Sequence, residues 1–333
     1  MTDNLEVVLA GPVLSQPCAD DFTLVESKAP EPQAGEMLVR NRYLSLDPYL
    51  GSRLRGRHMG QPAPRPGERL PGFCVGEVTV SRHPDFAVGE TVVGEIGWAL
   101  FGRLRGDAAR KVDPAVALSA HLGVLGMPGL TAWAGVTQLA KVKEGDVFVV
   151  DAASGAVGGT AGQIARRLGA RVVGIAGGPA KCALVREVYG FDDCVDYRTD
   201  DWIGALKAAC GSPPSVHFEN VGLKVLGPVL DMLGDYGRVV LCGLADHYQS
   251  DAPPAALPLG RVVARRAQIL GLVVYDFLPR FAEWTTLAAP WIAEGGLAYA
   301  EDVCDGLASA PRQFEKLMRG ENLGKTLVRI VPP

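Results

Sequence analysis

The sequence lacks paired cysteines. It has seven cysteines in 333 residues, and no two of them form a C-x-x-C pair. A disulfide framework or a zinc ribbon needs clustered or regularly spaced cysteines, so the pattern excludes both and favours the reducing cytoplasm. The cysteines are Cys18, Cys74, Cys182, Cys194, Cys210, Cys242 and Cys304.

An excess of positive charge is also absent. The chain has 33 Lys+Arg against 37 Asp+Glu, which gives a formal net charge of -4. Proteins that bind nucleic acid or anionic lipid use a basic surface, so we expect neither partner. Residues 1–6 include acidic side chains where a secretory signal carries Lys or Arg, and no long apolar run follows them. We therefore expect no export.

Charged residues are missing from one long stretch, residues 114–140. This length could span a bilayer. The stretch contains the sequence Gly-Met-Pro-Gly at 126–129 as well as polar residues. We therefore expect two buried helices on either side of a break rather than a membrane span.

The composition and the hydrophobic pattern of the sequence change near the middle of the chain. Residues 1 to about 110 are rich in glycine and proline and hold short β-type runs, which predicts a mostly β, barrel-like domain. From residue 147 apolar strands alternate with helices, as in a parallel sheet covered on both faces. The predicted strands are 147–151, 171–176, 194–197, 216–220, 238–242 and about 268–274, and the helices between them are about 157–168, 180–189, 202–209 and 223–233.

This alternation predicts the α/β class, with a doubly wound nucleotide-binding sheet of the Rossmann type. Helices at about 281–293 and 310–319 precede a final strand at 324–331, which we expect to return to the first domain. We therefore divide the chain into a substrate domain of residues 1–125, completed by 298–333, and a nucleotide-binding domain of residues 126–297.

A glycine-rich turn follows the first strand of the predicted nucleotide-binding domain and leads into a helix. Gly155 lets the turn tighten, Gly158 lets backbone amides approach a pyrophosphate, and the helix N-terminus adds partial positive charge. The same glycines could serve a plain tight turn. Their place within repeated strand–helix units favours dinucleotide binding.

The second strand lacks the acid that NAD sites use. In those sites an Asp or Glu about 20 residues beyond the glycines bonds the adenosine ribose. Here the strand ends in Ala-Gly-Gly-Pro-Ala-Lys at 176–181, without a carboxylate. Gly178 makes room for a phosphate and Lys181 can neutralise it, so NADP(H) is the predicted cofactor. The alternative is that Lys181 is a solvated helix residue.

The five histidines show no ligand spacing with one another or with the cysteines. We therefore predict no metal. Hydride transfer does not need one, because the nicotinamide carries the hydride.

Several segments along nearly the whole chain carry a family resemblance. They are 41–49 (NRYLSLDPY), 126–133 (GMPGLTAW), 152–159 (AASGAVGG), 218–222 (FENVG), Cys242-Gly243 with Tyr248, 289–292 (APWI) and 321–325 (ENLGK). With these segments the chain resembles the medium-chain dehydrogenase/reductase superfamily, and within it the zinc-free prostaglandin reductases and plant alkenal double-bond reductases.

The resemblance implies an N-terminal GroES-like β-barrel, a Rossmann domain and a substrate cleft between them. It also implies that NADPH reduces the carbon–carbon double bond of an enone or enal. The cofactor contacts that it implies are Gly155, Ala156, Val157 and Gly158 at the pyrophosphate, Lys181 and Tyr197 at the adenosine phosphate, Asn220 and Asn322 along the cofactor, and Met127 and Thr131 near the nicotinamide. To these contacts we add Gly178, Cys242, Tyr248, Leu272 and Val274.

Reduction of an enone places negative charge on the carbonyl oxygen, so the protein should supply a hydrogen-bond donor and a route for a proton. A tyrosine hydroxyl fits both tasks, and we select Tyr248, Tyr49 and Tyr43 from the eight tyrosines. Tyr248 follows the turn after the fifth strand, where open α/β sheets place ligands, and the other two lie in segment 41–49. The alternative is that each tyrosine is half-buried packing with a satisfied hydroxyl.

The leading hypothesis is an NADPH-dependent reductase of small unsaturated aldehydes and ketones, with tyrosine-assisted stabilisation and protonation of the enolate. One alternative is an NADPH quinone reductase of the same superfamily. Another is a non-catalytic NADPH-binding sensor or structural protein. We expect a homodimer, because relatives pair through the edge of the nucleotide-binding sheet and a bare edge strand is a liability.

Overall fold

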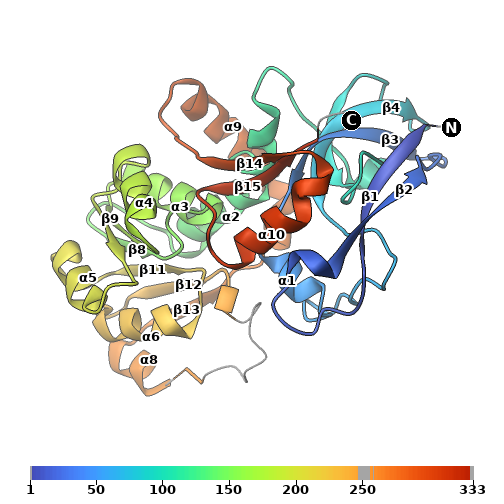
Figure 1. The fold of residues 1–333 in the computed structure, drawn as a ribbon. Helices are drawn as coiled ribbons and strands as arrows, with labels where there is room; N and C mark the ends of the chain where they lie inside the picture. The colour runs from blue at the N-terminus through green and yellow to red at the C-terminus, as the bar shows by residue number, and fades with distance from the viewer. Residues whose placement is uncertain (1, 247–255, 258, 331–333) are drawn as a thin grey trace.

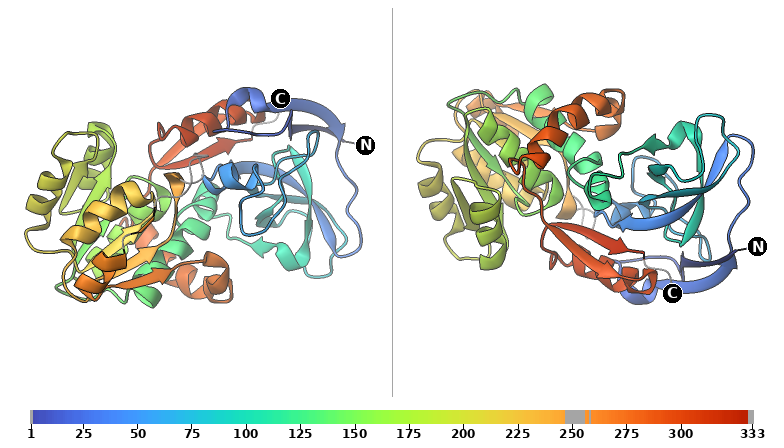
Figure 2. Two further views of the ribbon diagram at one scale, coloured as in Figure 1. Left: turned by 90° about the horizontal axis from the view of Figure 1, so that it is seen from below. Right: turned by 90° about the horizontal axis from the view of Figure 1, so that it is seen from above.

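The computed structural model describes residues 2–246, 256–257 and 259–330. Two lobes are visible in Figure 1 and Figure 2: an N-terminal lobe of strands in blue and cyan, and a second lobe in green to orange in which helices cover a sheet. The last part of the chain, in red, lies along the N-terminal lobe.

The N-terminal lobe is a curved, mostly antiparallel sheet with strand order β14-β15-β3-β4-β5-β7, in which β14 and β15 run parallel, β6 also pairs with β3 and the β1–β2 pair stands apart. The strands are β1 (Asp3–Leu9), β2 (Phe22–Lys28), β3 (Glu36–Ser45), β4 (Phe73–Ser81), β5 (Thr91–Glu95), β6 (Phe101–Arg105), β7 (Arg110–Lys111), β14 (Glu301–Asp305) and β15 (Lys325–Arg329). Irregular registers between β3 and β4 bend these strands. Inside the bend, the Trp98 ring stacks on Phe22 and meets Phe314 edge-on, both with centroids 5.7 Å away.

The second lobe holds a parallel sheet with strand order β10-β9-β8-β11-β12-β13. Its strands are β8 (Val147–Val150), β9 (Arg171–Ala176), β10 (Asp193–Asp196), β11 (Val216–Glu219), β12 (Arg238–Leu241) and β13 (Gln268–Gly271). Every residue of β8 is buried, as expected for a central strand with helices on both faces. The order reverses between β8 and β11, which is where doubly wound sheets bind ligands at the carboxyl ends of the strands.

Short helices and turns connect these strands. They are α1 (Tyr49–Arg53), η3 (Leu118–Leu122), α2 (Met127–Trp133), η4 (Ala134–Leu139), α3 (Ala156–Arg167), α4 (Pro179–Ala183), η5 (Leu184–Val188), α5 (Trp202–Cys210), α6 (Leu223–Met232), α8 (Leu259–Arg265), η6 (Val274–Arg280), α9 (Phe281–Ala293) and α10 (Ala310–Met318). The barrel-plus-Rossmann fold class predicted from the sequence is confirmed by this architecture.

The uncharged stretch 114–140 differs from its prediction in one detail. The residues Met127, Pro128 and Gly129 do not form a break; they are the first turn of α2, where a proline loses only an N–H that would have no helical partner. The chain turns just before them, at residues 123–126. A search of the described residues finds no helix with both the length and the apolar character needed to cross a bilayer.

Two other predicted elements differ in detail from the prediction. The strand predicted at 268–274 ends at Gly271, and a 3-10 segment, η6, starts at Val274. The helix predicted at 180–189 begins at Pro179 as α4 and changes to the wider π-helical turn η5 at Leu184.

The final strand, β15, lies antiparallel to β3, with Leu327 opposite Ser45 and Arg329 opposite Tyr43. The barrel sheet therefore contains strands that precede the nucleotide-binding strands in the sequence and strands that follow them. The domain boundaries at 125/126 and 297/298 stay predictions.

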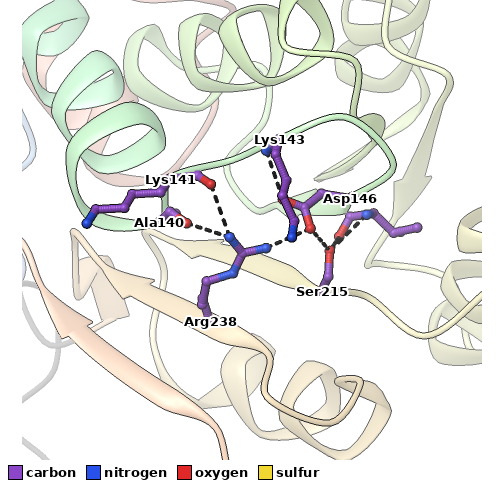
Figure 3. Close-up of polar contacts among 7 residues, drawn as sticks. Ala140, Lys141, Lys143, Asp146, Ser215 and Arg238 are labelled. Atoms are coloured by element: carbon purple, nitrogen blue, oxygen red, sulfur yellow. Dashed lines mark hydrogen bonds and ion pairs between the residues drawn. The ribbon is translucent and has the colours of Figure 1, made fainter.

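A buried ion pair joins the amino ends of β8, β11 and β12 (Figure 3). Arg238 contacts the Asp146 carboxylate at 2.6 Å and donates to the Ala140 carbonyl oxygen at 2.6 Å. Asp146 also accepts from the Ser215 hydroxyl at 2.8 Å and the Lys143 amide at 3.0 Å. This cluster fixes the end of the α2–η4 run against the sheet, opposite the edge that carries the candidate site.

Candidate active site

The glycine turn predicted to bind pyrophosphate links β8 to α3. Gly155 is the N-cap of α3 and provides no side-chain cap, and the helix begins at Ala156, one residue before the predicted start. The amides of a first helical turn have no partner within the helix. Those of Ala156, Val157 and Gly158 therefore supply donors and partial positive charge for a phosphate group.

Gly158 is required for a reason that the sequence analysis did not give. A Cβ atom there would lie 2.5 Å from the carbonyl oxygen of Ala152, so any side chain would push the turn away from the helix. Ala152 itself has a positive φ of 45°, which costs energy for a residue with a side chain. The cradle is thus a close-packed turn whose shape depends on glycine.

Cationic and aromatic side chains gather where β9 and β10 end. A Cβ atom on Gly177 would lie 2.9 Å from the Tyr197 ring and 3.0 Å from Nε of Arg198. Lys181 comes from α4 beside them, and its ammonium donates to the Gly320 carbonyl oxygen at 2.7 Å. Burial, followed by the nearby Arg198 charge, lowers the pKa of Lys181. Both effects are expected for a partly buried ammonium group beside another cation.

Arg198 was missed in the sequence analysis, although a signal was available. It follows Tyr197 directly at the end of the third parallel strand, and the carboxyl ends of adjacent parallel strands meet at one edge. An acidic side chain also reaches this edge: Asp196 accepts hydrogen bonds from the amides of Gly178, at 2.9 Å, and Arg198, at 3.0 Å. Its carboxylate therefore holds the turn at the ends of the two strands.

Buried acids lie beneath the middle of the edge, at the carboxyl ends of β8 and β11. Asp151 accepts from the Asn220 amide at 2.6 Å and approaches Nε2 of His217 at 3.2 Å, and its carbonyl oxygen accepts from Asn220 Nδ2 at 3.0 Å. Glu219 accepts from the amides of Val221 and Gly222. Burial, reinforced by the Asp151 charge, raises the pKa of Glu219 to about 9. We therefore expect Glu219 to be protonated at neutral pH.

This raised pKa predicts a specific stability effect. A carboxyl group whose pKa is raised by folding stabilises the fold below its ordinary pKa, and this contribution disappears as the pH rises toward 9. Glu219→Gln mimics the protonated form, so it should increase the free energy of unfolding at pH 8 by up to about 5 kcal/mol and flatten its pH dependence. Urea unfolding from pH 5 to 9 measures this, with the exposed Glu187→Gln as control. Equal pH dependence in the wild type and Glu219→Gln would contradict the assignment.

The other residues predicted to contact the cofactor, including Met127 and Thr131 near the nicotinamide, come from several elements. Met127 and Thr131 lie one turn apart on α2, and the Thr131 hydroxyl donates to the Met127 carbonyl oxygen at 2.7 Å. Leu272 is buried after β13 and Val274 opens η6, both in the same apolar cluster as half-buried Cys242. Asn322, in the turn before β15, donates to the Gly324 carbonyl oxygen at 2.9 Å.

Tyr49 is the first residue of α1, and its ring lies 4.8 Å from the His58 ring. Burial, followed by the nearby carboxylates of Asp47 and Glu95, raises the pKa of Tyr49 far above its ordinary value. The Tyr275 hydroxyl, from η6 of the second lobe, also acts on Tyr49. The sequence analysis did not select Tyr275, although it brings a second phenol from the opposite lobe toward the same place.

Of the other two selected tyrosines, the structure describes one, and it lies elsewhere. Tyr43 lies on β3 beside Arg329 and packs with a small apolar cluster that includes Val75 and Leu122. Tyr248 lies outside the described residues. Of the three selected tyrosines, Tyr49 is therefore the one that the structure describes at a position between the two lobes.

Together, the barrel, the Rossmann sheet and the phosphate cradle define a nucleotide-dependent oxidoreductase. The family models agree with this class: residues 6–112 match the N-terminal domain of oxidoreductase, and residues 156–294 match a model described as zinc-binding dehydrogenase. Among the residues that the structure describes, no group of three or more His, Cys, Asp or Glu side chains is placed to hold a metal ion. Reaction without a metal remains a prediction.

Similarity to known proteins extends over the whole length. The chain is 38% identical to the NADPH-dependent curcumin reductase of Escherichia coli, over 98% of this chain and 97% of the relative, and 35% identical to the NADP-dependent 2-alkenal reductase of Nicotiana tabacum, over 98% and 97%. The crystal structure of CurA from Vibrio vulnificus in complex with NADPH superposes with a TM-score of 0.92 at 36% identity, covering 99% of this chain and 100% of that one. The chain belongs to the prostaglandin reductase and alkenal reductase family of the medium-chain dehydrogenase/reductase superfamily, as its motifs predict.

Proposed function

We propose that this oxidoreductase uses NADPH to reduce the carbon–carbon double bond of small α,β-unsaturated aldehydes and ketones. The observation that carries the choice of cofactor is the group of Lys181, Tyr197 and Arg198 around Gly177, at a strand end without a carboxylate of its own. The reaction class rests on the full-length similarity to curcumin and alkenal reductases.

Each part of the site then has a physical task. When bound, the nicotinamide supplies a hydride for the β-carbon of the substrate. The first-turn amides of α3 hold the pyrophosphate, and the cations at Gly177 neutralise the adenosine phosphate. The Tyr49 hydroxyl stays protonated because its pKa is raised, so it can donate a hydrogen bond to the substrate carbonyl oxygen as negative charge develops there. We assign the same task to Tyr248, and we do not assign it to Tyr43, which packs with Val75 and Leu122 away from Tyr49.

The test is NADPH oxidation with an alkenal, an alkyl enone, an aryl enone and a quinone, with product masses to identify the bond reduced. A saturated aldehyde or ketone from the alkene substrates supports the proposal. Turnover of the quinone alone would move the chain to the quinone reductases. NADPH binding without turnover of any acceptor would favour a sensor or structural protein.

Replacement of Tyr49 by phenylalanine tests the hydrogen bond directly. Tyr49→Phe should lower kcat/KM for the enone about tenfold, which corresponds to the loss of about 1.4 kcal/mol of transition-state stabilisation. The Kd for NADPH should not change. Tyr236→Phe is the matched control, because Tyr236 is 69% exposed and lies over Arg266. An unchanged kcat/KM in Tyr49→Phe would remove Tyr49 from the mechanism.

We also propose a homodimer built on the free edge of the parallel sheet at β13. Val262 of helix α8 and Ile269 of β13 pack against the same apolar cluster, and α8 exposes Leu259 by 70% and Val263 by 75%. Apolar side chains beside an edge strand suit a second copy of the same surface. Val263→Glu should convert the dimer to a monomer in light scattering, whereas Val88→Glu, on the barrel surface, should not. A wild-type monomer at micromolar concentration would contradict this assembly.

A further inference from the structure

A buried lysine from the last strand reaches the turn that carries Tyr49. Lys325 opens β15 and is 5% exposed. Its ammonium contacts the Asp47 carboxylate at 2.7 Å and donates to the Leu46 carbonyl oxygen at 2.9 Å. Because β15 is fixed in the barrel sheet by its pairing with β3, the lysine is a rigid support rather than a surface cation.

The turn that it supports leads directly into Tyr49. Asp47 also accepts from the Ser45 hydroxyl through its other carboxylate oxygen, and its carbonyl oxygen accepts from the Leu50 amide at 3.1 Å. The carboxylate is thus held on both oxygens, one residue before Pro48 and two before Tyr49. A movement of this carboxylate would displace the first turn of α1.

Charge is the second reason why the contact matters. Asp47 is one of the groups that act electrostatically on the Tyr49 hydroxyl. If Tyr49 bonds the substrate oxygen, that oxygen gains negative charge during hydride transfer, and an unpaired carboxylate nearby would oppose the change. Lys325 offsets the Asp47 charge within hydrogen-bond distance.

We propose that Lys325 is a positioning residue for catalysis, which fixes the Asp47 turn and neutralises its carboxylate so that Tyr49 can stabilise the substrate oxygen. The proposal rests on the proposed function, because it assigns substrate contact to Tyr49. Lys325 also borders the same small pocket as Gly155 and Ala156, so the experiment has to separate this role from a contribution to cofactor binding.

The experiment compares Lys325→Met with the wild type in enone reduction. Lys325→Met should lower kcat/KM at least tenfold, largely through kcat, with the Kd for NADPH within about twofold of wild type. Lys325→Arg should retain most of the activity. In the double variant Lys325→Met/Asp47→Asn the unpaired charge is gone, so part of the lost kcat should return.

A second series tests whether the effect passes through Tyr49. In a Tyr49→Phe background, adding Lys325→Met should cause little further loss, because coupled residues are not additive. The proposal is overturned if the Lys325→Met variant has the wild-type rate. It is also overturned if Lys325→Met lowers kcat/KM by the same factor in the Tyr49→Phe background as in the wild type, or if NADPH affinity falls as much as activity.

A crystal structure of Lys325→Met separates this proposal from the proposed function. If the wild-type protein reduces no enone, the proposed function fails. The position of Tyr49 in the variant crystal then decides the positioning role: a displaced α1 turn supports it and an undisturbed turn overturns it. Lys111→Met, which removes the 2.7 Å pair with Glu90 elsewhere on the barrel, is the matched control for loss of an ion pair.

Discussion

Replacement of both Lys181 and Arg198 by alanine is expected to raise the Kd for NADPH about 100-fold and to leave the Kd for NADH nearly unchanged. Each charged hydrogen bond to a phosphate contributes about 1.5–3 kcal/mol, and about 1.4 kcal/mol corresponds to a factor of ten in affinity. Lys181 gives up its bond to the Gly320 carbonyl oxygen when it turns to a phosphate, so part of its gain is offset. Only the 2′-phosphate distinguishes the two cofactors, so only NADPH should respond.

Titration of intrinsic protein fluorescence at constant ionic strength measures both constants. Arg166→Ala, which removes an exposed cation from α3, is the control for a general change in charge. If wild-type protein binds NADH as tightly as NADPH, the assignment of the phosphate site is wrong. If both affinities fall together in the double variant, the cations act on a part of the cofactor that NADH shares.

Replacement of Arg238 by methionine is expected to destabilise the nucleotide-binding lobe by about 3 kcal/mol, because it leaves a buried carboxylate without its charged partner. The side chains of Asp146 and Arg238 are 5% and 17% exposed, so water compensates poorly for the loss. The midpoint of urea unfolding measures the change. Arg265→Met, which removes a 3.9 Å surface pair with Asp235, should change the free energy of unfolding by less than about 1 kcal/mol.

The same pair has a predictable pH dependence. Burial alone would raise the pKa of Asp146, but the bonds from the Lys143 amide, Arg238 and Ser215 outweigh it and hold this pKa below its ordinary value of 3.8. A carboxylate with a lowered pKa stabilises the fold above 3.8, and this contribution is lost as the pH falls through the lower, folded value. The stability difference between wild type and Arg238→Met should therefore shrink in acid. A constant difference from pH 7 to pH 3 would contradict this reading of Asp146.

The parts of the molecule that the sequence predicts are those with local signals. The alternation of apolar strands and helices predicts the order of the parallel sheet, and the glycines after β8 predict the phosphate turn, because each pattern is complete within a short segment. Even there, the reason for Gly158 emerged only from its approach to the Ala152 carbonyl oxygen.

The parts that could not be predicted depend on contacts between distant segments. Lys325 and Asp47 are 278 residues apart in sequence, and no periodicity relates them. Tyr275 reaches Tyr49 from another lobe, and its exposed position in a 3-10 segment gives no pattern of its own. Arg198 is an intermediate case. The sequence analysis did not select it, but the rule that the carboxyl ends of adjacent parallel strands meet at one edge would have placed it beside Lys181.

The pairing of β15 with β3 also determines when the barrel can be completed during synthesis. Residues 36–45 leave the ribosome early, yet one of their partner strands is at 325–329. The intervening nucleotide-binding sheet can form first, since its strands lie between residues 147 and 271. Until β15 has been synthesised, the end of β3 at residues 43–45 keeps an unpaired edge that can pair with other chains. Nascent chains stalled near residue 300 should accordingly depend on chaperones more than the released protein does.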